Sequence, residues 1–276
     1  MYLRISFKSQ MLGRGVGVHA FLPFHDGYED AQAPYPTLYF LPGYSANAEE
    51  LATLLPLRRF SAEYGVAVII PDGENSFYTD HPERCALFSS YVGDELVRVT
   101  RRMLPCLSTR REDTWIGGIS MGGYGALLHG LKNPQRYSSM GGYGACTNGL
   151  RWHDTFSKIV MFSPAIDVTD LLSERAGSLP NQLFSAWMGD EDSYRESWMN
   201  PRYSLLKAKE QGMDVPPMFL CCGRQDALVY DMCSRFADFA RKEGLPLTYL
   251  EGEGQHDIPF WDGMLEPAFR FMTESH

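Results

Sequence analysis

Short apolar segments of five or six residues alternate along this chain with longer segments that have helical spacing. A strand that is apolar on both faces is buried, and a helix between two such strands returns the chain to begin a parallel neighbour. The pattern predicts an α/β fold with a mainly parallel central sheet and helices on both faces. The expected buried strands are residues 37–41, 66–71, 114–118, 158–162, 217–222 and 246–251. The expected helices are residues 48–60, 90–104, 232–243 and 263–272.

Two further regions complete this organisation. Residues 2–9 and 16–23 have the pattern of an opening antiparallel pair of strands. Residues 167–204 have little strand pattern and several aromatic side chains, so we expect a small cap near the edge of the site. No linker rich in proline, glycine or serine divides the chain, and we interpret residues 1–276 as one domain.

The loops after the expected strands are the places to search for chemistry. In open parallel sheets, ligands bind beyond the carboxyl ends of the strands. The loops concerned are residues 42–47, 72–85, 119–123, 163–170, 223–228 and 252–261.

Residues 120–138 and 139–157 are two copies of one segment. Both begin SMGGYGA, and three later positions also match at the same period. A solenoid needs three or more units, so we interpret the repeat as a local tandem duplication. The alternatives for the second copy are an extra loop or short helix, a segment that reshapes the pocket, and a contact in a homo-oligomer.

The motif Gly118-Ile-Ser120-Met-Gly122 follows an expected strand and precedes a helical pattern. This placement is typical of a nucleophile elbow, a sharp strand-to-helix turn that exposes a reactive serine. Ser139 has the same residues after it, but Tyr137 stands where Ser120 has Gly118. Because the sharp turn needs small residues beside the serine, the sequence favours Ser120 over Ser139 as the nucleophile.

A serine hydroxyl is a poor nucleophile near neutral pH and needs a base. His256 follows the last expected strand, in a glycine-containing loop at the carboxyl end of the sheet, and we expect it to be that base. The other histidines precede the serine, lie in the two repeats or end the chain: His19, His25, His81, His129, His153 and His276.

Asp226 follows the expected strand 217–222 and precedes His256 by 30 residues (256 minus 226), which leaves room for one helix and one strand. An acid at this place would hold the imidazole in the correct tautomer and stabilise its charged form. Asp231 and Asp257 are the competing candidates, one at the start of the next helix and one adjoining the base.

Two backbone N–H groups are expected to hold a developing oxyanion. The N–H of Met121 begins the helix after Ser120, where the helix dipole adds positive charge. The N–H of Tyr44, in the loop after strand 37–41, is the expected second donor. The alternative for this second loop is a simple Pro42-Gly43 turn.

Charge and composition exclude other classes of protein. The net charge is −9 without a long basic run, which argues against nucleic acid or an anionic membrane as a partner. We expect no signal peptide and no membrane span. The six cysteines form no CxxC pair and no zinc-type cluster, so we expect no metal and reduced thiols in a cytoplasmic enzyme. Secretion without an N-terminal signal stays open.

Six segments together resemble the esterase D branch of the α/β-hydrolases, over nearly the whole chain. They are LPGYSAN at 41–47, PDGENSFYTD at 71–80, WIGGISMGGYGAL at 115–127, KIVMFSPAID at 158–167, CGRQDAL at 222–228 and GQHDIPFW at 254–261. The Tyr-Thr-Asp segment and GGYG after the serine are most similar to the tributyrin-esterase group. Pro42 replaces a histidine that is usual in the family, GGYG differs from the GGHG of S-formylglutathione hydrolases, and the duplication lies outside the family pattern.

The resemblance implies a serine carboxylesterase that acts on short-chain acyl esters and needs no cofactor. Alternatives are a thioesterase similar to S-formylglutathione hydrolase, a carbohydrate acetyl or feruloyl esterase, and an inactive hydrolase fold that serves as a binding module. Five aromatic side chains are candidates for a substrate pocket: Tyr78, Phe162, Trp187, Phe260 and Trp261.

Overall fold

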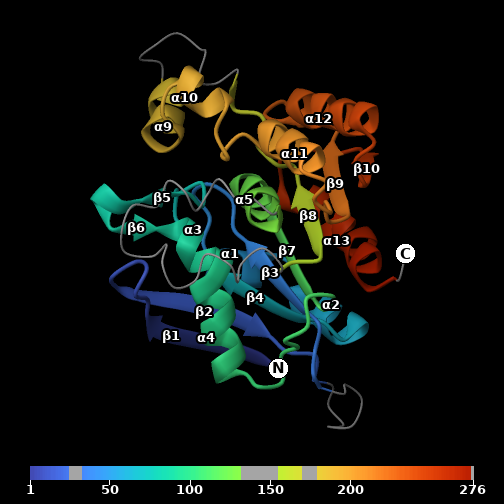
Figure 1. Ribbon diagram of the computed structural model, residues 1–276. Helices are drawn as coiled ribbons and strands as arrows, with labels where there is room; N and C mark the ends of the chain where they lie inside the picture. Colours follow the sequence, from blue (N-terminus) through green and yellow to red (C-terminus); the bar gives the residue numbers. More distant parts are fainter. Residues whose placement is uncertain (25–32, 132–154, 170–178, 275–276) are drawn as a thin grey trace.

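An eight-stranded sheet runs through the middle of the molecule, with helices on both sides (Figure 1). The computed structural model describes residues 1–24, 33–131, 155–169 and 179–274. The strands are β1 (Tyr2–Lys8), β2 (Gly15–Phe21), β3 (Thr37–Leu41), β4 (Ala67–Pro71), β7 (Thr114–Ile119), β8 (Lys158–Phe162), β9 (Met218–Gly223) and β10 (Leu247–Gly252). Their spatial order is β1-β2-β4-β3-β7-β8-β9-β10. Only the β1–β2 and β2–β4 pairs in this sheet are antiparallel, so the expectation of a mainly parallel sheet is confirmed.

The central strands divide their side chains between two hydrophobic cores. Every residue of β3, β4, β7 and β9 is buried, as their unbroken apolar sequences require. Within β3, Leu38 and Phe40 enter one core, and Tyr39 and Leu41 enter the other. The period of two in a strand therefore supplies both faces of the sheet from one short segment.

The two cores lie under different helices. One core includes residues of α1 (Ala48–Leu54), α2 (Leu57–Tyr64) and α13 (Ile258–Thr273). The other includes residues of α4 (Leu96–Met103), α5 (Met121–Gly130), α11 (Pro201–Glu210) and α12 (Tyr230–Glu243). Phe60 of α2 stacks on Phe269 of α13 with ring centroids 5.2 Å apart, which joins the helices of the first face.

Two helices differ from the sequence-based expectation. Residues 48–60 form two helices instead of one, because Leu55 is extended ahead of Pro56, which disfavours helical geometry in the residue before it. The helix expected at 90–104 contains a π-helical turn, Tyr91–Glu95, between α3 (Phe88–Ser90) and α4. Glu95 of this turn is buried and accepts the N–H of Gln10 at 2.7 Å, which ties it to the turn after β1.

The expected cap, residues 167–204, includes two short helices, and a small hairpin lies near them. The hairpin of β5 (Asp80–His81) and β6 (Ala86–Leu87) encloses the 3-10 turn Pro82–Arg84. The helices α9 (Leu179–Met188) and α10 (Glu191–Arg195) lie together near this hairpin (Figure 1). His81 Nε2 is 3.1 Å from the carbonyl oxygen of Trp187, so α9 contacts the hairpin directly.

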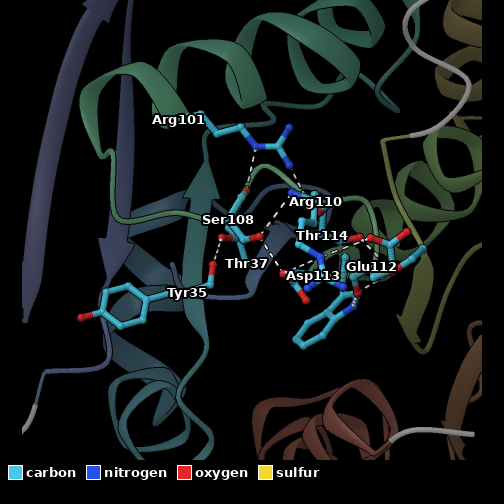
Figure 2. Close-up of polar contacts among 10 residues, drawn as sticks. Tyr35, Thr37, Arg101, Ser108, Arg110, Glu112, Asp113 and Thr114 are labelled. Carbon is cyan, nitrogen blue, oxygen red and sulfur yellow. Dashed lines mark hydrogen bonds and ion pairs between the residues drawn. The ribbon is translucent and has the colours of Figure 1, made fainter. Parts of the chain in front are cut away.

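A polar network closes the opposite, amino end of β3 and β7 (Figure 2). The Thr37 N–H donates to the Asp113 carbonyl oxygen at 2.8 Å. Arg101 donates to the Thr114 hydroxyl at 2.7 Å and to the Ser108 carbonyl oxygen at 3.1 Å. Ser108 in turn donates to the Asp113 carboxylate at 2.7 Å. These bonds fix where the two central strands begin.

No described helix has both the length and the apolar character needed to cross a membrane.

Candidate active site

The site lies where the chain leaves two neighbouring strands in opposite directions. β3 and β7 are parallel neighbours, with Leu41 opposite Gly118. After β3 the chain enters α1 on one face of the sheet, and after β7 it enters α5 on the other face. The loops diverge at such a switch point, which opens the crevice where ligands bind in α/β sheets.

Ser120 occupies a strained turn between β7 and α5. Its φ is 53° and its ψ is −115°, a conformation that costs a non-glycine residue about 1–3 kcal/mol. Glycine is required on both sides. A Cβ atom on Gly122 would lie 2.0 Å from the Leu41 carbonyl oxygen, and one on Gly118 would lie 2.5 Å from the backbone carbon of Gly122. The expected elbow geometry is therefore present at Ser120. Ser139 lies outside the described residues.

Met121 is the first residue of α5, and its side chain is buried. The first N–H groups of a helix have no carbonyl partner within the helix, and they lie at the positive end of its dipole. The Met121 N–H is therefore placed directly beside Ser120 as an available donor for negative charge.

The Gly43-Tyr44 peptide lies against the elbow from the other side. A Cβ atom on Gly43 would be 3.3 Å from the Ile119 carbonyl oxygen and 3.4 Å from Ser120 Cβ, so this loop lies in contact with the elbow. The Gly43 carbonyl oxygen accepts the Ala46 N–H at 3.3 Å, which closes a turn. The Tyr44 side chain is 37% exposed at the surface of this turn. The structure thus brings the loops of both expected oxyanion donors, on Tyr44 and Met121, to the same serine.

Asp226 and His256 form a hydrogen-bonded pair. His256 Nδ1 is 2.7 Å from Asp226 Oδ2, and the Asp226 side chain is fully buried while that of His256 is 22% exposed. The other carboxylate oxygen accepts the N–H groups of Leu228 and Val229, each at 3.1 Å. Burial alone would raise the pKa of Asp226, but His256 and the two N–H groups together lower it below its usual value. Asp226 is thus held ionised beside the imidazole.

The loops that carry this pair are joined to each other. The Arg224 N–H donates to the Gly252 carbonyl oxygen at 2.9 Å, and the Gln225 N–H donates to that of Gly254 at 3.0 Å. Gly223 makes this contact possible, because a Cβ atom there would lie 2.3 Å from the Gly254 oxygen. The ends of β9 and β10 therefore keep the acid and the base in register.

The two competing carboxylates have other roles. Asp257 is the N-cap of α13 and accepts the Phe260 N–H at 3.2 Å. Asp231 is exposed in the first turn of α12. Of the three candidates, Asp226 is the one that the structure pairs with His256.

Trp261 supports the imidazole from the side. Its ring meets the His256 ring edge-on, with centroids 5.1 Å apart and an interplanar angle of 85°. Its indole N–H donates to the Ser163 hydroxyl at 3.2 Å, and Ser163 directly follows β8. The indole is thus fixed between the end of β8 and the expected base.

Three of the five aromatic residues proposed for a substrate pocket belong instead to the packed interior. Phe162 packs edge-on against Phe40 at 5.7 Å in the core. Phe260 is 5% exposed and fills the space beside Gly254, where a Cβ atom would be 2.6 Å from its ring. Tyr78 is fully buried. Their apolar sequence context could not separate core from pocket. Trp187 and Trp261 are only partly buried and stay predictions for substrate contact.

The sequence-based expectation missed how the loop after β4 is built. Phe77 and Tyr78 have φ values of 48° and 56°, a region that bulky residues rarely adopt. Burial raises the pKa of the Tyr78 hydroxyl well above its usual value of 10, and nearby Asp72 and Tyr91 raise it further. The group therefore keeps its proton and can act as a hydrogen-bond donor. The PDGENSFYTD motif pointed to this loop without revealing its contacts.

Known proteins similar in sequence to this chain are esterases. A family model described as Esterase matches residues 9–139. An acetyl esterase of Caldicellulosiruptor saccharolyticus is 31% identical over 286 aligned positions, which cover 99% of this chain and 98% of the relative.

Solved structures show the same fold. The serine hydrolase FphF of Staphylococcus aureus superposes with a TM-score of 0.80 at 23% identity, covering 100% of this chain and 99% of that one. The S-formylglutathione hydrolase FrmB of the same species gives 0.78 at 23% identity, with 99% of each chain covered. A ferulic acid esterase gives 0.73 at 20% identity, covering 99% of this chain and 97% of that one. The fold is that of the α/β-hydrolases.

Proposed function

Because this chain belongs to the esterase family, we propose that it hydrolyses short-chain acyl esters by an acyl-enzyme mechanism with Ser120, His256 and Asp226. One observation carries the proposal. A buried aspartate and a histidine pair at 2.7 Å at the same sheet end as a serine in a strained elbow. Such a constellation has little structural purpose and matches the needs of acyl transfer.

The first step is attack of Ser120 Oγ on the ester carbonyl carbon. The Ser120 proton passes to His256 Nε2, the ring nitrogen that Asp226 does not bind. The carbonyl oxygen becomes an oxyanion, which the N–H groups of Met121 and Tyr44 stabilise. Collapse of the tetrahedral intermediate breaks the bond to the alcohol, which takes the proton from His256.

The second step releases the acid. A water molecule gives a proton to His256 and attacks the acyl-enzyme, and the same two N–H groups hold the second oxyanion. Ser120 then recovers its proton from His256 as the acid leaves. Every step uses groups of this chain, the ester and water.

The relatives support a small acyl group and leave alternatives for the rest of the substrate. The 31% identical relative is an acetyl esterase, which favours small acyl groups, as the tributyrin-type resemblance also does. A structural neighbour that acts on S-formylglutathione and one that is a ferulic acid esterase keep thioesters and feruloyl esters as alternatives. A cytoplasmic location and a homo-oligomer remain predictions from the sequence.

An inactive hydrolase fold that only binds a partner is the alternative from another class. The paired Asp226 and His256 and the strained turn at Ser120 argue against it, because a binding module has no need to retain them.

A substrate panel tests the proposal. Purified wild-type protein, Ser120→Ala and Ser139→Ala are assayed with p-nitrophenyl acetate, butyrate and octanoate, an acetylated xylo-oligosaccharide, methyl ferulate and S-formylglutathione. We expect turnover of the acetate and butyrate esters by the wild type and by Ser139→Ala, and none by Ser120→Ala. Turnover by Ser120→Ala, or an inactive wild type across the panel, would overturn the proposal.

A further inference from the structure

The loop formed by residues 73–78, after β4, contacts the loop formed by residues 42–45, after β3, at several points. The Tyr78 hydroxyl donates to the Pro42 carbonyl oxygen at 2.8 Å. The Asn75 side-chain oxygen accepts the Ser45 N–H at 2.7 Å. The first bond holds the Pro42–Gly43 peptide, and the second holds the Tyr44–Ser45 peptide. The Gly43–Tyr44 peptide lies between them, and its N–H faces the elbow in the proposed mechanism.

The same loop also reaches the second donor. The Phe77 N–H lies 3.4 Å from the sulfur of Met121, the residue that supplies the other expected oxyanion donor. The Phe77 ring packs against the Tyr44 ring, with centroids 5.8 Å apart, and against Phe184 of α9 at 4.9 Å. Residues 75–78 therefore contact both halves of the expected oxyanion hole.

Tyr78 is built into a slot that fits its side chain closely. A Cβ atom on Gly73 would lie 2.0 Å from the Tyr78 hydroxyl oxygen, and one on Gly125 would lie 2.4 Å from its ring. The Tyr78 carbonyl oxygen is 3.2 Å from His129 Nε2, so α5 holds this residue by both ring and backbone. Tyr78 has a left-handed φ, and its ring lies against both glycines with its hydroxyl on Pro42.

We propose that Tyr78 and Asn75 are positioning residues for the oxyanion donor on Tyr44, which they set by holding the peptides on its two sides. The inference rests on the proposed acyl-enzyme function. It assigns the buried Tyr78 a part in catalysis through the backbone, in place of the contact with substrate that the sequence suggested. Backbone donors stabilise an oxyanion only when they are held in place before the reaction.

The test compares Tyr78→Phe and Asn75→Ala with the control Tyr39→Phe. Tyr39 is also fully buried, and its hydroxyl is bonded to Thr100 at 2.9 Å away from the site. All three variants are measured for kcat and KM with p-nitrophenyl acetate, for inhibition by a trifluoromethyl ketone, and for unfolding by urea. The ketone forms a tetrahedral oxyanion adduct on a serine, so its affinity reports the oxyanion hole directly.

We expect Tyr78→Phe and Asn75→Ala to lower kcat by about 10–100-fold, because small displacements of a catalytic group are costly. The inhibition constant of the ketone should rise by a similar factor, while KM stays near the wild-type value. Both chemical steps pass through an oxyanion, so we expect the loss of oxyanion stabilisation to appear in kcat. Tyr39→Phe should lose stability and keep both kcat and ketone affinity.

Several outcomes would overturn the inference. One is a Tyr78→Phe or Asn75→Ala protein with wild-type kcat and ketone affinity. Another is a rise in KM alone, which would indicate substrate contact. Should Tyr78→Phe not fold, Asn75→Ala decides, because Asn75 is only partly buried. Ser120→Ala is assayed in parallel. An active Ser120→Ala protein refutes the proposed function, whereas an inactive one beside a fully active Tyr78→Phe protein refutes this inference alone.

Discussion

The two ends of β3 and β7 are built on opposite principles. At the amino end, Thr37 and Thr114 begin their strands within a network of ordinary hydrogen bonds that includes Arg101 and Asp113 (Figure 2). At the carboxyl end, the same strands run into a strained serine, two required glycines and a close contact between loops. The amino end is closed by hydrogen bonds, whereas the backbone at the carboxyl end is strained. Only about five residues of strand separate the two ends.

Backbone strain follows the same division. Seven described residues other than glycine have a left-handed φ: Ser45, Glu74, Phe77, Tyr78, Cys85, Ser120 and Ser163. All but Cys85 lie in loops that follow the carboxyl ends of β3, β4, β7 or β8. Each such residue costs of order 1–3 kcal/mol, and strain of this kind collects at functional sites. The hydrogen bonds at the amino end stabilise the fold, and the strained backbone at the carboxyl end lowers that stability.

The largest effect should come from the acid at the carboxyl end. Asp226→Asn keeps the shape and the acceptor for the Leu228 and Val229 N–H groups but favours the wrong imidazole tautomer. We expect kcat to fall by roughly 10⁴-fold. Steady-state kinetics with p-nitrophenyl acetate measures this. Asp231→Asn, at an exposed position, is the matched control and should be fully active.

Gly122→Ala should damage both activity and stability. The added methyl group would meet the Leu41 carbonyl oxygen at 2.0 Å, so the elbow or the end of β3 must move. Overpacking of this kind costs about 1–3 kcal/mol, and the displacement should lower kcat by about 100-fold. Gly13→Ala serves as a control at a glycine with open space around it, although its φ of 63° makes some loss of stability expected there too. A Gly122→Ala protein with wild-type kcat would contradict the account.

At the amino end, we expect a substitution to lower stability and to leave activity unchanged. Arg101→Met removes the bonds to the Thr114 hydroxyl and the Ser108 carbonyl oxygen. We expect the free energy of unfolding to fall by about 1–3 kcal/mol, because partly buried acceptors lose a charged donor. The kcat of the folded protein should stay unchanged. Urea unfolding and steady-state kinetics on one preparation test both halves, and a large fall in kcat would break the contrast between the two ends.

The smallest effect is on stability in acid. The pKa of Asp226 is lowered in the folded protein, so its ionised form stabilises the fold at pH values above the usual 3.8. This contribution is lost as the pH falls through the lowered pKa, because the unfolded chain then binds the proton more readily. The difference in unfolding free energy between the wild type and Asp226→Asn should therefore shrink between pH 5 and the most acidic pH at which the protein folds. A difference that grows on acidification would contradict the pKa assignment.

Much of this molecule was predictable because its signals are local. The strand at 37–41 and the strand at 158–162 have the bounds that their apolar segments indicate. The pairing of Asp226 with His256 followed from position, since both residues come directly after consecutive strands of a parallel sheet. The order of the strands and the positions of the loops were therefore enough to predict the candidate residues, without knowledge of any side-chain contact.

The rest depends on contacts between distant residues. Nothing in the sequence near Tyr78 shows that its hydroxyl reaches Pro42, 36 residues earlier (78 minus 42), or that Gly73 and Gly125 make room for its ring. Three of the five aromatic candidates lie in the core instead of a pocket, for a related reason. An apolar ring is equally suited to a core and to a pocket, and only packing distinguishes the two. The second copy of SMGGYGA, at residues 139–145, lies outside the described residues, so its role stays a prediction.

The most direct test of the central claim is to identify the serine that a fluorophosphonate probe labels in the wild-type protein. Trypsin separates the two candidates, because cleavage after Arg111, Lys132, Arg136 and Arg151 places Ser120 and Ser139 in different peptides. Mass spectrometry should find the probe on Ser120 in the peptide 112–132 and none on the peptide 137–151. Labelling of Ser139, or no labelling of either serine by a protein that hydrolyses esters, would contradict the account.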